Sequence, residues 1–160
     1  MSRKLAREIA FKVVFSNNFQ STEGITSDLI HELVETLAKD VEFINAENED
    51  NLSTEDRKYI DEISMGVMQK TEELDDKIKT YLKGWTMDRI GKTDLAILRL
   101  AVYEILYRED IPYKVSINEA VELAKRFCDD TSPSFINGVL AALIHSLPES
   151  QEGETKDSEV

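Results

Sequence analysis

Apolar residues recur at helical spacing along most of the chain, and one run lacks a polar face. Residues 94–108 read DLAILRLAVYEILYR, and the charged residues inside this run are Arg99 and Glu104. A helix that is apolar nearly all round is a buried helix. The run is too long for a typical strand, and too short and too charged for a membrane span. It therefore predicts the central helix of the fold.

The segments on both sides of this run are amphipathic with a period near 3.6 residues, as in helices that share one core. The first helix is predicted over residues 3–19, and the second begins at residue 26 or 27 and reaches about residue 41. The other helix starts carry capping residues, which are Ser53 or Thr54, Thr71, the capping-box pair Ser116 and Glu119, and Ser132 followed by Pro133. These patterns predict an all-α protein of about seven helices.

Composition places the chain among soluble globular proteins of a reducing compartment. It has 160 residues, of which 41% are hydrophobic, and a single cysteine, so no internal disulfide can form. Neither a signal peptide nor a membrane-spanning run is present in the sequence, which predicts a cytoplasmic protein without a membrane partner. We expect one helical domain over residues 1–147 and an acidic, disordered tail over 148–160.

Charge is distributed unevenly. The net charge is −13, yet residues 1–20 carry a net charge of +3, which is a local basic footprint on an acidic body. The acidic run between residues 45 and 56 is interpreted as a solvated loop; its members are Glu47, Glu49, Asp50, Glu55 and Asp56. It lacks the ligand spacing and the turn glycine of a calcium loop.

The sequence offers no constellation typical of catalysis or metal binding, so we expect neither an enzyme nor a metal or cofactor site. His31 and His145 lack a nucleophile motif and are interpreted as surface or boundary residues. Cys128 precedes Asp129 and Asp130, and acidic neighbours raise a thiol pKa, so it is expected to be unreactive.

Two charged residues inside the central helix require partners, because an unpaired buried charge is costly. For Arg99 the candidate carboxylates are Glu104 and Glu119, with Asn118 adding hydrogen bonds. These four residues are predicted to form a structural polar cluster that joins the central helix to the next one. A binding role for the same residues stays open.

Several blocks together resemble the NusB family of bacterial transcription antitermination factors. The blocks are RKLAREIAFKVVF, AILRLAVYEI, IPYKVSINEAVELAKRF and SPSFINGVL, and they run from about residue 3 to residue 147 in the family's order. The resemblance implies two packed helical bundles around the buried central helix. It also implies binding of boxA RNA in ribosomal RNA leader transcripts as a heterodimer with the ribosomal protein NusE. RNA polymerase and other Nus factors would complete the antitermination complex, without cofactor or catalysis.

The family's binding surfaces carry over residue by residue. The implied RNA-binding residues are Arg3, Lys4, Arg7, Phe15, Thr131 and Phe135. The implied NusE-binding residues are Tyr81, Asp88, Arg89, Lys92 and Asp94. Basic side chains would contact phosphates and an exposed Phe would stack on bases, although both Phe residues are alternatively interpreted as core.

This chain departs from the family pattern at two places, where Leu5 replaces a basic residue and an acidic pair follows Cys128. We therefore expect weak RNA binding that NusE strengthens. The alternative is an all-α protein-interaction scaffold with weak or no RNA binding, and the same module also occurs in ribosomal RNA cytosine methyltransferases. The chain has no room for a methyltransferase domain, which favours the stand-alone factor.

Overall fold

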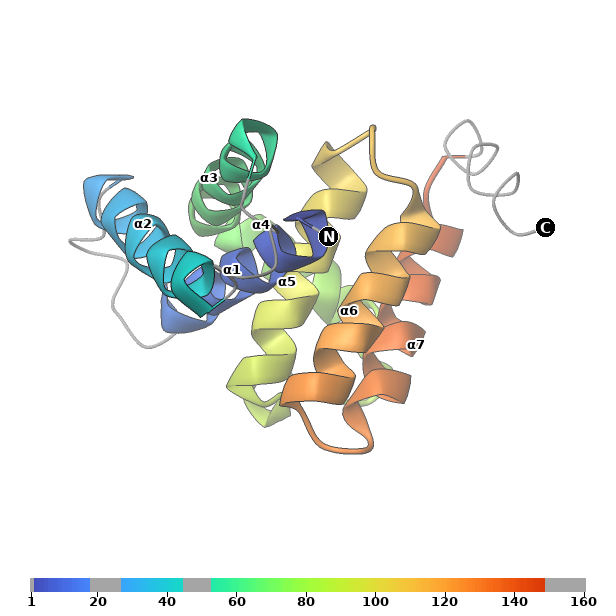
Figure 1. Ribbon diagram of the computed structural model, residues 1–160. Helices are drawn as coiled ribbons and strands as arrows, with labels where there is room; N and C mark the ends of the chain where they lie inside the picture. The colour runs from blue at the N-terminus through green and yellow to red at the C-terminus, as the bar shows by residue number, and fades with distance from the viewer. Residues whose placement is uncertain (1, 18–26, 45–52, 149–160) are drawn as a thin grey trace. The chain divides into compact units, whose positions relative to one another are not determined.

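The computed structural model describes residues 2–17, 27–44 and 53–148, and the regular secondary structure among them is helical, with no strand (Figure 1). The seven α-helices found in these described ranges confirm the predicted all-α class. Their bounds are α1 (Ser2–Asn17), α2 (Ser27–Ile44), α3 (Thr54–Gln69), α4 (Thr71–Thr80), α5 (Lys92–Tyr107), α6 (Tyr113–Phe127) and α7 (Ser132–His145), with a short 3-10 helix, η1 (Met87–Arg89). The predicted helix end at Phe19, most of the acidic loop and the tail from 149 lie outside the described residues.

The chain divides into two compact units, Met1–Gln69 and Lys70–Val160. In the first unit, α1 packs against both α2 and α3, and α2 packs against α3. The buried apolar side chains that α1 and α3 supply include Ala6, Ile9, Ala10, Val13, Tyr59, Ile60 and Ile63. The amphipathic period of these segments thus sets which face of each helix turns inward.

Ser53 begins α3 as its sequence predicts. Its hydroxyl oxygen accepts a hydrogen bond from the Asp56 backbone N–H (3.1 Å) and donates to the Asp56 carboxylate (2.9 Å). These two hydrogen bonds give a partner to a backbone N–H that the start of a helix leaves without an intrahelical acceptor. Asp56 is only 5% exposed, so the interpretation of the whole acidic run as solvated is wrong at this residue. The run ends in a helix cap, and the cap turns this carboxylate inward.

In the second unit, α5 is the central helix. It packs against α4, α6 and α7, and α6 packs against α7. The fully or nearly fully buried apolar side chains of α5 are Ala96, Ile97, Leu98, Leu100, Ala101, Val102 and Ile105. Each buried Leu or Ile contributes about 1.5–3 kcal/mol, so this one helix carries a large share of the unit's stability. The prediction from its apolar pattern is confirmed within this unit.

Three predicted helix caps are wrong. Thr71 is the first residue of α4 and Lys70 precedes it as a cap without a side-chain hydrogen bond. Helix α6 begins at Tyr113, after Pro112, so Ser116 lies inside the helix instead of capping it. At α7 the N-cap is Thr131, again without a side-chain bond. Instead of capping a helix, the Ser116 hydroxyl donates a hydrogen bond to Glu104 on α5, and the Ser132 hydroxyl donates one to Asp94 on α5. Carboxylates that are removed from solvent require such hydrogen bonds.

Arg99 and Glu104 of α5 each form a hydrogen bond with a neighbouring helix. Arg99 forms a bidentate pair with Asp75 on α4, at 2.8 and 2.7 Å, which the sequence prediction had not considered. Glu104 is completely buried and accepts a 2.8 Å hydrogen bond from Ser116 on α6. Asn118 is exposed, which corrects its assignment to a buried cluster, and Glu119 on α6 is half-buried.

Candidate functional site

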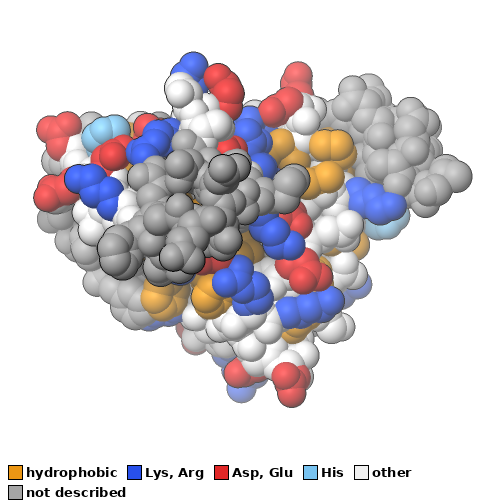
Figure 2. Space-filling view, in the orientation of Figure 1, with side chains coloured by type: hydrophobic (Ala, Val, Ile, Leu, Met, Phe, Trp, Pro, Cys, Tyr) orange, Lys and Arg blue, Asp and Glu red, His pale blue; other side chains and the backbone are white. Residues whose placement is uncertain are grey.

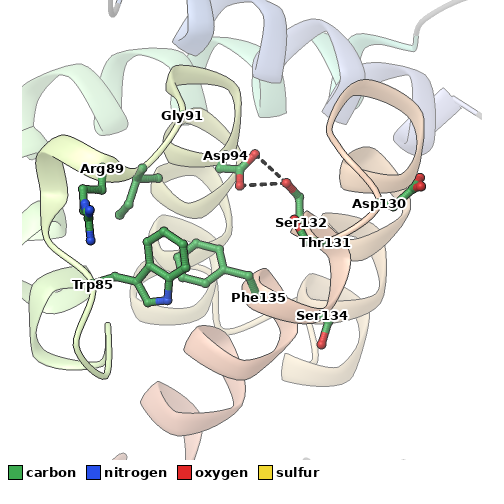
Figure 3. A pocket seen from close by; sticks show the side chains of 10 residues that line it. Trp85, Arg89, Gly91, Asp94, Asp130, Thr131, Ser132, Ser134 and Phe135 are labelled. Atoms are coloured by element: carbon green, nitrogen blue, oxygen red, sulfur yellow. Dashed lines mark hydrogen bonds between the residues drawn. The ribbon is translucent and has the colours of Figure 1, made fainter.

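A pocket of about 600 Å³ opens in the second unit, where the segment before α5 meets the start of α7. Its volume falls in the range of small-ligand sites. Figure 3 shows the side chains that line it. The lining residues are Trp85, Arg89, Ile90, Gly91, Asp94, Asp130, Thr131, Ser132, Ser134 and Phe135.

An aromatic pair forms one side of the pocket. The rings of Trp85 and Phe135 have centroids 5.7 Å apart and an interplanar angle of 55°, a tilted arrangement that aromatic rings favour. Trp85 is 54% exposed. It follows a turn in which Lys83 (φ 47°) and Gly84 (φ 90°) adopt left-handed backbone, which glycine tolerates without a steric penalty. This turn ends the α4 segment and directs the indole outward, against α7.

Asp94 lines the side of the pocket opposite the aromatic pair. The Ser132 hydroxyl lies 3.0 and 2.9 Å from the two Asp94 carboxylate oxygens, as the dashed lines in Figure 3 mark. Burial, and next a hydrogen bond to Asp94, raise the pKa of the Cys128 thiol to about 12. The thiol is therefore protonated at neutral pH and is a poor nucleophile. One carboxylate thus ties the first turn of α5 to the start of α7.

Residues that the sequence assigned to two different surfaces meet in this one pocket. The resemblance implies that Thr131 and Phe135 bind RNA and that Arg89 and Asp94 bind NusE, and all four line this pocket. Trp85 was missed altogether. The available signal was a lone tryptophan directly after a glycine, in a connector between two amphipathic helices.

The remaining predicted NusE-binding residues are close in sequence to residues that line the pocket. Asp88 on η1 and Lys92 at the start of α5 are exposed. Tyr81 follows α4 and its hydroxyl is hydrogen-bonded to the Ser146 hydroxyl (2.7 Å), which ties the end of α4 to the end of α7. The NusE assignment of these residues stays a prediction.

In the first unit, the basic start of α1 is partly engaged with α3. The Arg3 guanidinium lies 3.2 Å from the Asp56 carboxylate and 4.6 Å from the Tyr59 ring centroid. Arg7 lies 5.5 Å from the same centroid and is only 4% exposed, although its predicted contact with RNA requires a side chain that reaches the surface. An aromatic face and a carboxylate compensate these charges.

Contacts with Ser53 and Arg3 also lower the pKa of Asp56. Burial raises its pKa, but hydrogen bonds from Ser53 and Arg3 outweigh burial and hold the pKa below 3.8. Asp56 is therefore ionised at neutral pH and fixes the Arg3 side chain. Of the predicted RNA-binding residues in this unit, Lys4 is exposed, Arg3 is about one-third exposed and Phe15 is half-buried against Phe11, with centroids 6.3 Å apart.

Charge on the described surface is mixed. On the face shown in Figure 2, basic and acidic side chains are interspersed along α6 and the loop after it. No group of three or more His, Cys, Asp or Glu residues within the described ranges could hold a metal ion. Likewise, no helix in the described part of the chain is long and apolar enough to cross a bilayer. His31 and His145 are exposed, as predicted.

Within its described residues, the protein is all-helical and has a pocket lined by aromatic and polar side chains. Residues 4–145 match the model of the NusB family. The chain is 39% identical to the transcription antitermination protein NusB of Acetivibrio thermocellus, over 99% of this chain and 100% of that one. It is 42% identical to the corresponding protein of Clostridium botulinum strain Kyoto, over 90% of this chain and all of the relative. The chain belongs to the NusB family.

Solved structures share the fold. A crystal structure of NusB from T. maritima superposes with a TM-score of 0.78 at 27% identity, over 96% of this chain and 98% of that chain. A complex of NusB and NusE with double-stranded RNA contains a chain that gives a TM-score of 0.72 at 23% identity, over 91% of this chain and 98% of that one.

Proposed function

We propose that this protein is a transcription antitermination factor that binds boxA RNA of ribosomal RNA leader transcripts as a heterodimer with NusE. The observation that carries the proposal is membership of the NusB family over residues 4–145. A structure of the same fold in complex with NusE and double-stranded RNA supplies a precedent for both partners. The heterodimer would act in the cytoplasm with RNA polymerase and other Nus factors.

The first unit would contribute phosphate contacts. Lys4 is exposed and Arg3 is partly exposed, so both can reach a phosphate, whereas Arg7 supports this surface from within. Each phosphate contact releases about one condensed counterion from single-stranded RNA, which makes affinity fall with salt. Phe15, which is half-buried, would contribute part of one ring edge to the same surface.

The second unit would contribute contacts to bases. Phe135 lies beside an exposed tryptophan, and Thr131 at the start of α7 is exposed. Single-stranded RNA is recognised by stacking of unpaired bases on aromatic side chains. NusE would contact Tyr81, Asp88 and Lys92, with Arg89 and Asp94 at the border of the pocket. Acidic side chains on this surface suit a basic ribosomal protein and would speed association.

The test is a titration of labelled boxA RNA with this protein, with and without NusE, at two salt concentrations. We expect weak, sequence-selective binding that NusE tightens, and a scrambled RNA serves as the control. Lys4→Ala should lower the slope of log affinity against log salt by about 0.7–0.9. Lys58→Ala is the matched variant, since it removes an exposed lysine of the same unit from α3, and it should leave the slope unchanged.

A second candidate function is a protein-interaction scaffold. It is favoured by the net charge of −13 and by the internal engagement of Arg3 and Arg7. The same titration separates the two functions. NusE binding without any preference between boxA and scrambled RNA would establish the scaffold and refute the antitermination proposal.

A further inference from the structure

We propose that the pocket between Trp85 and Asp94 holds a single unstacked guanine base of the bound RNA. One ring of the tilted Trp85–Phe135 pair would stack on the face of the base while the other holds it in place, and Asp94 would accept hydrogen bonds from the edge of the base. The inference rests on the proposed function, because it names the nucleotide that this site takes. It assigns Arg89 and Asp94 to the RNA and leaves Tyr81, Asp88 and Lys92 to NusE.

The aromatic pair is suited to a base. The rings come from the segment after α4 and from the first turn of α7, and the 5.7 Å contact fixes them against each other. Trp85 keeps 54% of its surface exposed although tryptophan is usually buried, so one indole face is available to a flat ligand. An exposed ring that is held rigid loses little conformational entropy when it binds.

The polar lining disfavours a phosphate. The lining contains two carboxylates, those of Asp94 and Asp130, and one guanidinium, that of Arg89. The Ser132 hydroxyl is already directed at Asp94 and does not offer its proton to an anion. A neutral group that carries N–H donors fits this lining better than an anion does. Arg89 is exposed at the rim, where it can reach the phosphate that follows the base.

The carboxylate selects guanine among the four bases. Guanine presents two neighbouring donors, N1–H and N2–H, on its Watson–Crick edge, and a carboxylate accepts both in parallel. Adenine, cytosine and uracil have no two adjacent donors on that edge. Each places an acceptor directly beside its donor, so the second carboxylate oxygen would be repelled. Asp94 is oriented by Ser132 and keeps further lone pairs for a ligand, since an ionised carboxylate has about four acceptor positions.

The protein carries its own reporter, because Trp85 is its only tryptophan. We would titrate the full chain, with NusE bound, with boxA RNA and follow both RNA anisotropy and Trp85 fluorescence, subtracting the signal of NusE measured alone with RNA. A stacked base should quench the indole. Trp85→Ala and Phe135→Ala should each weaken binding about 5- to 150-fold, which corresponds to one base stack, and Trp85→Phe should retain most of the affinity.

Base identity is tested with RNAs in which each guanine in turn is replaced by inosine or adenine. Inosine lacks the N2 amino group, so the parent protein should bind more weakly to the RNA in which the guanine held by the pocket is replaced by inosine. Asp94→Asn should abolish the difference at that position. Phe127→Ala removes an aromatic ring that is 37% exposed on α6, outside the pocket, and should bind RNA like the parent.

Failure of the inference is distinguishable from failure of the proposed function. Selective boxA binding without quenching of Trp85, and with unchanged affinity of Trp85→Ala, would refute the pocket and leave the function standing. Quenching without any inosine effect would refute the guanine assignment. Absence of any RNA binding with NusE present would overturn both.

Discussion

The ion pair between Arg99 and Asp75 is expected to be a major link between α4 and α5. The two hydrogen bonds are 2.8 and 2.7 Å long, and the side chains are 14% and 21% exposed. The bidentate geometry is the strong form of this interaction. The perturbation that tests it is Arg99→Met, which retains the aliphatic stem of the side chain and removes the charge.

The expected magnitude follows from the exposure of the pair. Breaking a fully buried ion pair costs about 3–5 kcal/mol, whereas an exposed pair contributes about 0–1 kcal/mol. Since both side chains are mostly buried, we expect Arg99→Met to lower the free energy of unfolding by about 2–3 kcal/mol. The loss comes mainly from Asp75, which keeps its charge and loses its partner. Adding Asp75→Leu should restore part of the stability.

The assay is urea unfolding followed by the fluorescence of Trp85, which lies in the same unit as the pair. A loss of about 2 kcal/mol corresponds to a midpoint lower by about 1 M urea. Lys125→Met is the matched control, because its pair with Glu122 is 3.3 Å long and half-exposed, and the cost should stay below about 0.5 kcal/mol. A cost for Arg99→Met below about 1 kcal/mol would refute the argument, as would a double variant no more stable than the single one.

Three further changes probe other contacts. Asp56→Asn should destabilise the first unit by about 1–2 kcal/mol at pH 7. Since the pKa of Asp56 lies below 3.8, the parent should lose this contribution as the pH falls through that lowered pKa, and circular dichroism can follow the loss. Cys128, with a pKa of about 12, should react with iodoacetamide at pH 8 far more slowly than an ordinary thiol, and Asp94→Ala should accelerate the reaction. Glu104→Ala should cost about 2–4 kcal/mol in urea unfolding, and Glu104→Gln clearly less, because the amide still accepts a hydrogen bond.

Each of these expectations has a contradicting outcome. Equal acid sensitivity of the parent and Asp56→Asn would show that the carboxylate contributes nothing through ionisation. Alkylation of Cys128 at the rate of a small-molecule thiol would contradict its raised pKa. Equal losses for the two Glu104 variants would mean that the negative charge, and not the hydrogen bond, is what the site requires.

The helices and the central position of α5 within its unit could be predicted from the sequence, because apolar spacing is a local property. A run such as residues 94–108 cannot expose any face without cost, so its burial follows from the chain itself. The family could likewise be inferred from sequence blocks alone. By contrast, the caps at Ser116 and Ser132 were wrong because their hydroxyls are taken by carboxylates of another helix.

Which side chains meet was decided by the tertiary structure. Asp75 reaches Arg99 only because α4 packs on α5, and Asp56 is buried only because α1 brings Arg3 to the start of α3. Trp85 and Phe135 are 50 residues apart in sequence, and periodicity carries no information on which helix ends come together. The sequence therefore determined the elements and their inward faces. The packing of those faces determined the polar partners and the pocket, because partners and pockets are made of contacts between elements.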